Sequence, residues 1–192
     1  MGVEHTPVAD LVGPKAQFES SYREAMAEFV AEGRVEELGS LPNHARFADY
    51  VKELRDWSRG SGPPTGSVPG SMFWLVEGDR FIGKVEIRHR LTEALRLRGG
   101  HVGYAIRPTE RHRGYGRMVL SLALRPCLDL GLPKILLTCD TTNEASRRII
   151  EGNGGVLEDV IYLPGQPAGV MRYWIDVADV LDTPVTYPGD AP

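Results

Sequence analysis

Apolar residues recur at helical spacing in the first third of the chain. Over residues 16–38 they follow a period near 3.6, which is typical of an amphipathic helix. The same spacing predicts a second helix over residues 43–57. Residues 58–71 are rich in Gly, Pro and Ser, so we expect a flexible loop there. A short strand is expected before the first helix, over residues 9–14.

Strand patterns dominate the middle of the chain. Residues 72–77 and 80–88 are β-rich and flank a Gly-Asp pair, which predicts a tight hairpin. Residues 101–106 form a further strand pattern, and an apolar helix over 114–130 separates it from a buried-type strand over 134–139. This order describes a βαβ unit, so we expect the strands on either side of the helix to be parallel neighbours.

The last elements are a short helix over 143–151 and a hairpin of strands 156–163 and 170–177. Beyond them the chain is Pro-rich, and we expect a frayed tail over 183–192. The whole order predicts an α+β (mixed α/β) class, with a twisted mixed sheet of about six to seven strands flanked by helices. With 192 residues, the chain is expected to fold as one domain, since a domain typically takes about 100–200 residues.

Charge is unevenly distributed along the chain. The 22 Lys and Arg against 26 Asp and Glu give a formal net charge of −4, which argues against a protein that coats nucleic acid. Residues 84–117, however, hold nine basic and three acidic side chains, a local charge of +6, so the remainder carries −10. A basic segment in an acidic protein indicates a local anion site.

The cysteines and the N-terminal residues bear on the compartment. Cys127 and Cys139 make no disulfide framework, and we expect two reduced, packed thiols. The sequence has no Cys and His cluster with metal-ligand spacing, so we expect no metal. Residues 1–13 lack the pattern of a signal peptide, and no apolar run approaches the ~20 residues that span a bilayer. We therefore expect a cytoplasmic protein without a membrane partner.

The most informative run is Arg111-His112-Arg113-Gly114-Tyr115-Gly116-Arg117, which follows a predicted strand and opens a predicted helix. Its glycines let the backbone approach a ligand closely, and the free N–H groups and dipole of a helix N-terminus favour an anion. Its arginines can add charge-assisted bonds. The run predicts a pyrophosphate site, with a plain glycine turn as the alternative. A P-loop is excluded because no Lys-Ser/Thr pair follows, and a Rossmann fingerprint because Val119 replaces its third glycine.

Two motifs in this sequence resemble those of the GNAT superfamily, the Gcn5-related N-acetyltransferases. The family's Gln/Arg-x-x-Gly-x-Gly/Ala motif, preceded by a strand and a Val-x-Pro-like step, matches the run at 111–116 after Ala105-Ile106-Arg107-Pro108. The family's Asn-x-x-Ser helix start matches Asn143-Glu144-Ala145-Ser146. The resemblance extends over about residues 72–177. It implies a single GNAT-like domain over residues 1–192 with a central βαβ unit.

The resemblance implies an acyltransferase that moves an acetyl group from acetyl-CoA to a primary amine, by direct attack in a ternary complex and without a metal. One strand would pair with pantetheine through its backbone, the glycine-containing loop would cradle the pyrophosphate, and the start of the 143–151 helix would hold the pantetheine side. The implied cofactor-binding residues are Tyr104, Ala105, Ile106, Arg111, His112, Arg113, Gly114, Tyr115, Gly116, Arg117, Asn143 and Ser146. Asn143 could equally be the N-cap of its helix, and Ser146 a first-turn residue.

The catalytic groups are less evident than the cofactor site. The backbone N–H of Ile106 would stabilise the oxyanion. Ile150 stands where many relatives have a tyrosine acid, and Thr138 where some have a carboxylate. Glu86 and His101 are the candidate bases, with an ion pair to Arg88 or Arg107 as the alternative for Glu86 and a packed or surface imidazole as the alternative for His101. Candidate replacement acids are Tyr115, Tyr162 and Tyr173.

Two other functions stay open at this point. The missing tyrosine is compatible with a non-catalytic acyl-CoA-binding or sensing module. The arginine-rich segment gives a weaker argument for nucleic-acid binding. The amine acceptor is unidentified, and the protein is expected to be a monomer or homodimer. By family analogy, the early helices and the 58–71 loop border the acceptor groove. Their acidic residues suit a cationic acceptor or simply a solvated surface: Glu28, Glu32, Glu36, Glu37 and Asp49.

Overall fold

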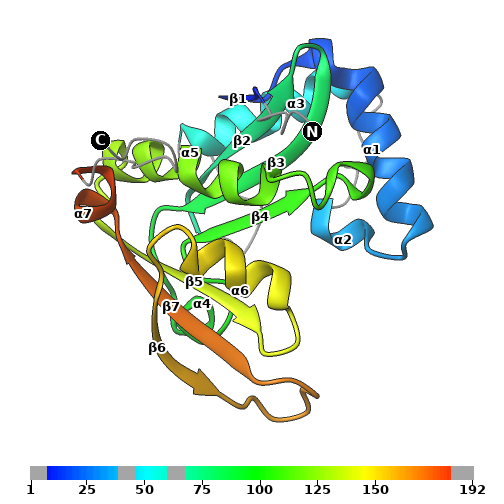
Figure 1. Cartoon of the computed structure of the whole chain (residues 1–192). Coiled ribbons are helices and arrows are strands. Elements are labelled where there is room, and N and C mark those ends of the chain that lie inside the picture. Colours follow the sequence, from blue (N-terminus) through cyan, green and yellow to red (C-terminus); the bar gives the residue numbers. More distant parts are fainter. Residues whose placement is uncertain (1–7, 39–45, 60–67, 183–192) are drawn as a thin grey trace, which may run out of the picture.

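Seven strands form the frame of the computed structural model, which describes residues 8–38, 46–59 and 68–182. They are β1 (Asp10–Val12), β2 (Gly70–Glu77), β3 (Arg80–Arg88), β4 (Val102–Ile106), β5 (Lys134–Asp140), β6 (Val156–Ile161) and β7 (Val170–Asp176). One antiparallel sheet has the order β1-β2-β3-β4 and a second has the order β5-β7-β6. Figure 1 shows the second sheet extending away from the first. The mixed α/β class and the number of strands are as predicted.

Helices cover both faces of the first sheet. In chain order, the described helices are η1 (Ala16–Phe18), α1 (Glu19–Ala31), α2 (Val35–Leu38), α3 (Phe47–Ser58), α4 (Glu93–Leu97), η2 (Pro108–Glu110), α5 (Tyr115–Asp129), α6 (Glu144–Glu151) and α7 (Val177–Asp182). The single helix expected over 16–38 is interrupted at Gly33, whose φ of +68° takes the chain out of helical geometry. The stretch before β4 also contains a helix, α4, which the sequence pattern did not indicate.

Both predicted hairpins are confirmed. β2 and β3 pair antiparallel around Gly78, which adopts a φ of +56° in the turn, and Glu77 lies opposite Arg80. β6 and β7 pair with Val156 opposite Trp174. These pairings fix which residues of β3 and β4 face each side of the first sheet.

Two clusters of buried side chains pack on opposite faces of the first sheet. On one face, α1 and α3 pack their apolar residues around Trp74 and Phe81, which are fully buried. On the other face, α5 packs against Ile82, Val85 and Ile106. Both free cysteines are buried on this second side, as expected. The sheet is therefore held between two helical layers, with β4 as its last strand (Figure 1).

The structure differs from the expected single sheet between β4 and β5, because no ladder joins these strands in the described part of the chain. They approach at His101, whose backbone N–H donates to the Leu136 carbonyl at 2.7 Å and whose Nδ1 accepts the Leu136 N–H at 2.9 Å. Gly100 packs on the same carbonyl, where a Cβ would lie 2.3 Å from the oxygen. An apolar strand pattern is the same whether its neighbour pairs with it or diverges, so the sequence did not reveal this separation.

Several predictions fall on residues outside the described ranges. These are most of the expected loop over 58–71, the start of the helix predicted over 43–57, and the whole of the predicted tail over 183–192. None of the helices that are described combines the length and apolar composition needed to cross a bilayer.

Candidate functional site

A cavity of about 860 Å³ opens where β4 and β5 diverge. β4 and the end of β5 form two of its walls, and the loop over residues 111–117 and the first turns of α6 close it. The family resemblance assigned three of these segments to one cofactor site: β4, the loop and the start of α6. The structure brings them together around one space.

The backbone of β4 offers unpaired polar groups to this cavity. Arg107 N–H donates to the Ile82 carbonyl and Arg88 N–H donates to the His101 carbonyl, so odd-numbered residues of the strand bond to β3. In an antiparallel pair the residues between them point their N–H and C=O groups the opposite way. Because β4 is the last strand of its sheet, the N–H groups of Tyr104 and Ile106 face the cavity.

The N-terminus of α5 forms the far end of the cavity. His112 and Gly114 both have positive φ, +61° and +85°, which turns the chain sharply into the helix. The first N–H groups of a helix have no partner within it, and they carry the positive end of its dipole. Gly116 allows Ile149 to pack directly against this end of the helix, since a Cβ at Gly116 would lie 2.5 Å from Ile149 Cδ1. The local geometry is that of an anion site.

The arginines of the loop differ in what they can reach. Arg113 pairs with Glu110 and lies over the Tyr115 ring, and neither Arg113 nor Tyr115 has its side chain in the described cavity lining. Arg117 does line the cavity, and it makes no ion pair with any described residue. Of the predicted pyrophosphate ligands, Arg117 is therefore the arginine whose charge is best placed for an anion.

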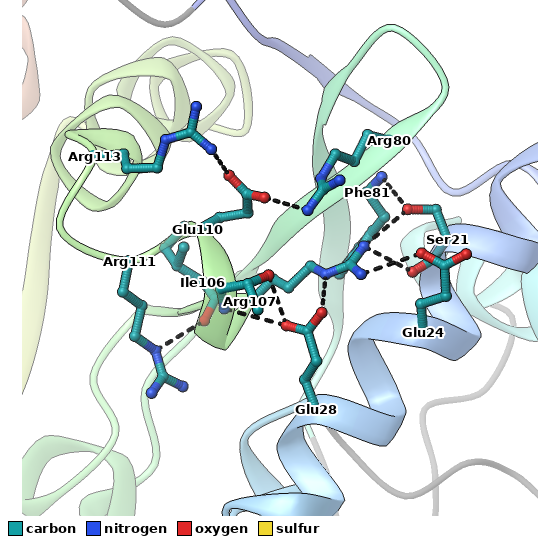
Figure 2. A network of polar contacts seen from close by, with 11 residues as sticks. Ser21, Glu24, Glu28, Arg80, Phe81, Ile106, Arg107, Glu110, Arg111 and Arg113 are labelled. Atoms are coloured by element: carbon teal, nitrogen blue, oxygen red, sulfur yellow. Dashed lines mark hydrogen bonds and ion pairs between the residues drawn. The ribbon is translucent and has the colours of Figure 1, made fainter.

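Much of the local basic charge is neutralised by an acidic stripe, which consists of Glu24 and Glu28 on α1 and Glu32 at its end. Figure 2 shows Glu24 and Glu28 beside Arg107. Arg107, only 4% exposed, donates from Nε to Glu28 at 2.7 Å and from Nη2 to Glu24 at 3.2 Å. Its Nη1 reaches the Ser21 hydroxyl at 3.1 Å. Burial raises the pKa of Glu28, but hydrogen bonds from Arg107 and Thr109 outweigh this and lower it overall.

Arg111 continues this contact between the loop and the early helices. Its Nη1 lies 2.8 Å from Glu32, and its Nε donates to the Ile106 carbonyl at 3.1 Å. Glu28 is thus bound to Arg107 (Figure 2), and Glu32 is bound to Arg111. The interpretation that they attract a cationic acceptor does not hold for these two residues, because their charge is already neutralised.

Glu110 fixes the other side of the loop. Its carboxylate is 2% exposed and accepts hydrogen bonds from both Arg80 and Arg113 (Figure 2). A buried carboxylate is stable only when such partners compensate its lost hydration. The loop is therefore anchored to the β2–β3 hairpin as well as to α1.

The α6 wall carries a group of side chains that meet β4 and β5. Asn143 caps α6 by accepting the Ser146 N–H at 3.0 Å, which is the alternative role considered for it. The Ser146 hydroxyl lies 2.9 Å from the Tyr104 hydroxyl. Cys139, from β5, lines the same region, and burial raises its pKa to about 11. Cofactor contacts of Asn143 and Ser146 stay predictions.

The two candidate bases lie outside the described cavity lining. Glu86 forms an ion pair with Arg88 at 3.0 Å, which is the alternative to a catalytic base that the sequence left open for this residue. His101 is 8% exposed and turned toward Leu136, and burial lowers its pKa to about 4. The candidate acids Tyr115 and Tyr173 are buried elsewhere; the other, Tyr162, is 78% exposed.

The cavity is also lined by residues that the sequence did not assign to the cofactor site. Arg34 and Glu37, from the α1–α2 region, lie there with Arg88 and Arg98. Arg98 is held by Asp140 at 2.7 Å. These side chains come from segments distant in sequence, and no local pattern marks them. Among the described residues, no group of His, Cys, Asp and Glu is arranged to hold a metal ion.

Comparison with known families agrees with this architecture. A family model described as "Acetyltransferase (GNAT) domain" matches residues 16–156, well over half of the chain. No curated protein matches the chain significantly by sequence.

Solved structures provide the second comparison. The ribosomal-protein-S5-alanine acetyltransferase from Vibrio fischeri superposes with a TM-score of 0.64 at 14% identity, covering 89% of this chain and 94% of that one. RimJ from Mycobacterium smegmatis, solved with CoA-disulfide, gives 0.62 at 16% identity, over 92% and 88%. A spermidine N-acetyltransferase SpeG chimera from Vibrio cholerae and hSSAT gives 0.59 at 17% identity, over 91% and 99%. At these identities the likeness concerns the fold.

Proposed function

The chain belongs to the GNAT acetyltransferase family, and from this premise we propose that it moves an acetyl group from acetyl-CoA to a primary amine, by direct attack within a ternary complex. The observation that carries the proposal is the cavity between β4 and β5. It joins a helix N-terminus, suited to phosphate, to a strand whose Tyr104 and Ile106 N–H groups face the cavity. An elongated molecule with a phosphate end and an amide-containing arm fits that combination.

The residues present fit CoA in kind. The pyrophosphate would be held by the N–H groups at the start of α5 and by Arg117, because both lack a partner within the described protein. The backbone of Tyr104 and Ala105 would lie along pantetheine as an added strand. Asn143 and Ser146 border the same space from α6. When bound, acetyl-CoA supplies the activated acyl carbon.

The chain's own contribution to chemistry begins at Ile106. Its N–H points to the cavity, and a backbone donor so placed would stabilise the oxyanion formed when an amine attacks the thioester. The Ile106 carbonyl, in the next peptide group, accepts a hydrogen bond from Arg111 Nε at 3.1 Å. The amine must arrive unprotonated, and a lysine-like amine with a pKa near 10.4 is neutral only about one part in a thousand at neutral pH. Glu86 and His101 stay candidates for that deprotonation, acting through water.

The test separates binding from turnover. Calorimetry with CoA should give a binding signal that Gly114→Glu abolishes. Thiol release from acetyl-CoA should then be followed with a panel of primary amines: spermidine, free amino acids and short peptides with N-terminal Ser or Ala. Turnover with any of them supports the transferase. CoA binding without turnover across the panel favours the alternative of a non-catalytic acyl-CoA-binding module, and no CoA binding overturns both.

A further inference from the structure

The Tyr104 side chain spans the cavity from β4 to α6. Its hydroxyl lies 2.9 Å from Ser146 Oγ and 3.5 Å from the Ser146 carbonyl oxygen. Tyr104, Ser146 and Cys139 all line the cavity. A phenol from one wall therefore reaches the first turn of the helix that forms the opposite wall.

The second turn of that helix borders the cavity with aliphatic side chains. Ile150 lies one turn beyond Ser146 on the same face of α6, since residues four apart are neighbours on a helix. It is 1% exposed and lines the cavity with an aliphatic side chain. Among the described residues that line the cavity, the one phenol is that of Tyr104, which reaches α6 from β4.

We propose that the Tyr104 phenol is the catalytic proton donor to the sulfur of the leaving CoA, an inference that rests on the acetyl transfer proposed above. Ser146 is the positioning residue, because its hydroxyl holds the phenol in the cavity.

The placement on β4 brings this phenol to the reacting atoms. Tyr104 and Ile106 are two residues apart, so their side chains share one face of the strand and their Cα atoms lie about 6.5–7 Å apart. A thioester whose carbonyl oxygen accepted the Ile106 N–H would lie along β4, the strand that also carries Tyr104. Burial raises the pKa of Tyr104, so the phenol carries its proton at neutral pH and can donate it to the sulfur as the carbon–sulfur bond breaks.

Every bond and proton in the proposed step is accounted for. The amine nitrogen bonds to the carbonyl carbon, and the carbon–sulfur bond breaks with its electron pair on sulfur. The sulfur takes the Tyr104 proton and leaves as the CoA thiol. The phenolate regains a proton from water through the Ser146 hydroxyl, and the proton lost by the amine passes to water. The net reaction consumes acetyl-CoA and amine and yields amide and CoA, with no further reactant.

A readout that needs no acceptor tests the assignment. The thiol of bound CoA is titrated by the ultraviolet absorbance of its thiolate, with the spectrum of the free protein subtracted. A phenol that donates to the thiolate lowers the pKa of that thiol, so Tyr104→Phe should raise it by about 1–2 pH units, the range that a hydrogen bond to a charged group gives. The matched control is Tyr173→Phe, which removes a phenol bonded to Glu151 at 3.0 Å, outside the described cavity lining.

The outcomes are distinguishable. A raised thiol pKa in Tyr104→Phe with CoA affinity retained, and no change in Tyr173→Phe, supports the proposal. With an acceptor in hand, kcat should fall by about 10²-fold while KM for acetyl-CoA stays within a few-fold. Ser146→Ala, which leaves the phenol in place but unheld, should show a smaller rise. An unchanged thiol pKa in Tyr104→Phe, or loss of CoA binding there, overturns the proton-donor role, whereas a wild type that never binds CoA overturns the proposed function instead.

Discussion

Arg107 Nε donates to Glu28 Oε1 at 2.7 Å and so joins the start of the cofactor loop to the middle of α1. Arg107 is buried, and Glu28 also accepts hydrogen bonds from the N–H and hydroxyl of Thr109. Removing one partner of a buried charged pair leaves the other uncompensated. The pair therefore matters to stability more than an exposed one would.

Glu28→Ala should lower the free energy of unfolding by about 2–3 kcal/mol, because it leaves the Arg107 guanidinium short of a charged acceptor. Urea denaturation at neutral pH measures this. Glu19→Ala on the same helix is the matched control, since Glu19 pairs with Arg23 at the surface and such pairs contribute about 0–1 kcal/mol. Equal losses in the two variants would contradict the structural importance of the Arg107 contact.

Gly114→Glu should weaken CoA binding by about 100-fold or more, because it adds a negative charge where the pyrophosphate is expected. The variant also strains a residue with a φ of +85°. Gly131→Glu serves as the control for that strain: Gly131 has a φ of +75°, lies outside the described cavity lining and has open space around its Cβ position. Calorimetry should find CoA affinity retained in the control. A similar loss in both variants would mean that strain, and not the site, explains the effect.

Arg117→Ala should reduce CoA affinity by about 10–100-fold, the range of one charge-assisted bond. Arg113→Ala should change it by only a few-fold, since that guanidinium is occupied by Glu110. The comparison tests which loop arginine meets phosphate, and titration of both variants with CoA measures it. The opposite ranking would require Arg113 to leave Glu110 when the cofactor binds.

His101 should make the fold sensitive to mild acid. Burial, reinforced by Arg96 and Arg88, lowers its pKa from 6.5 to about 4. The unfolded chain therefore binds the proton first, so this contribution is complete above pH 6.5 and is lost as the pH falls toward 4. Between pH 7 and pH 5 the loss is about 2 kcal/mol.

His101→Asn tests this dependence, because its side-chain oxygen can accept the Leu136 N–H but cannot titrate. Urea denaturation at both pH values should show a smaller drop for the variant than for the wild type. Identical pH slopes would show that carboxylates, and not His101, set the acid sensitivity.

The sequence predicted the parts of the site whose chemistry is local. The glycine loop and the helix after it were predicted because a turn, a helix start and basic charge occupy consecutive positions. The separation of β4 from β5 was not, since it depends on how His101 and Gly100 meet Leu136 across 35 residues. The reach of the Tyr104 phenol to Ser146 is also a tertiary contact, and a strand pattern treats that residue only as packing.

Counting charges along the sequence likewise does not reveal which charges pair in the folded chain. The basic excess over residues 84–117 indicated an anion site, and Arg117 is placed to serve one. Arg107 and Arg111, however, are bound to glutamates of α1 that lie about 80 residues earlier. Composition records the two charges but not the pairing, because the pairing is created by docking α1 beside the loop.

That docking has a consequence for the order of assembly. The Arg107–Glu28 contact joins residues 79 apart, and contacts between distant residues close slowly because the intervening chain must first lose conformational freedom. During synthesis, α1 is complete long before its arginine partners have been made. Until residue 111 has left the ribosome, Glu28 and Glu32 lack their arginine partners and are hydrated by water instead.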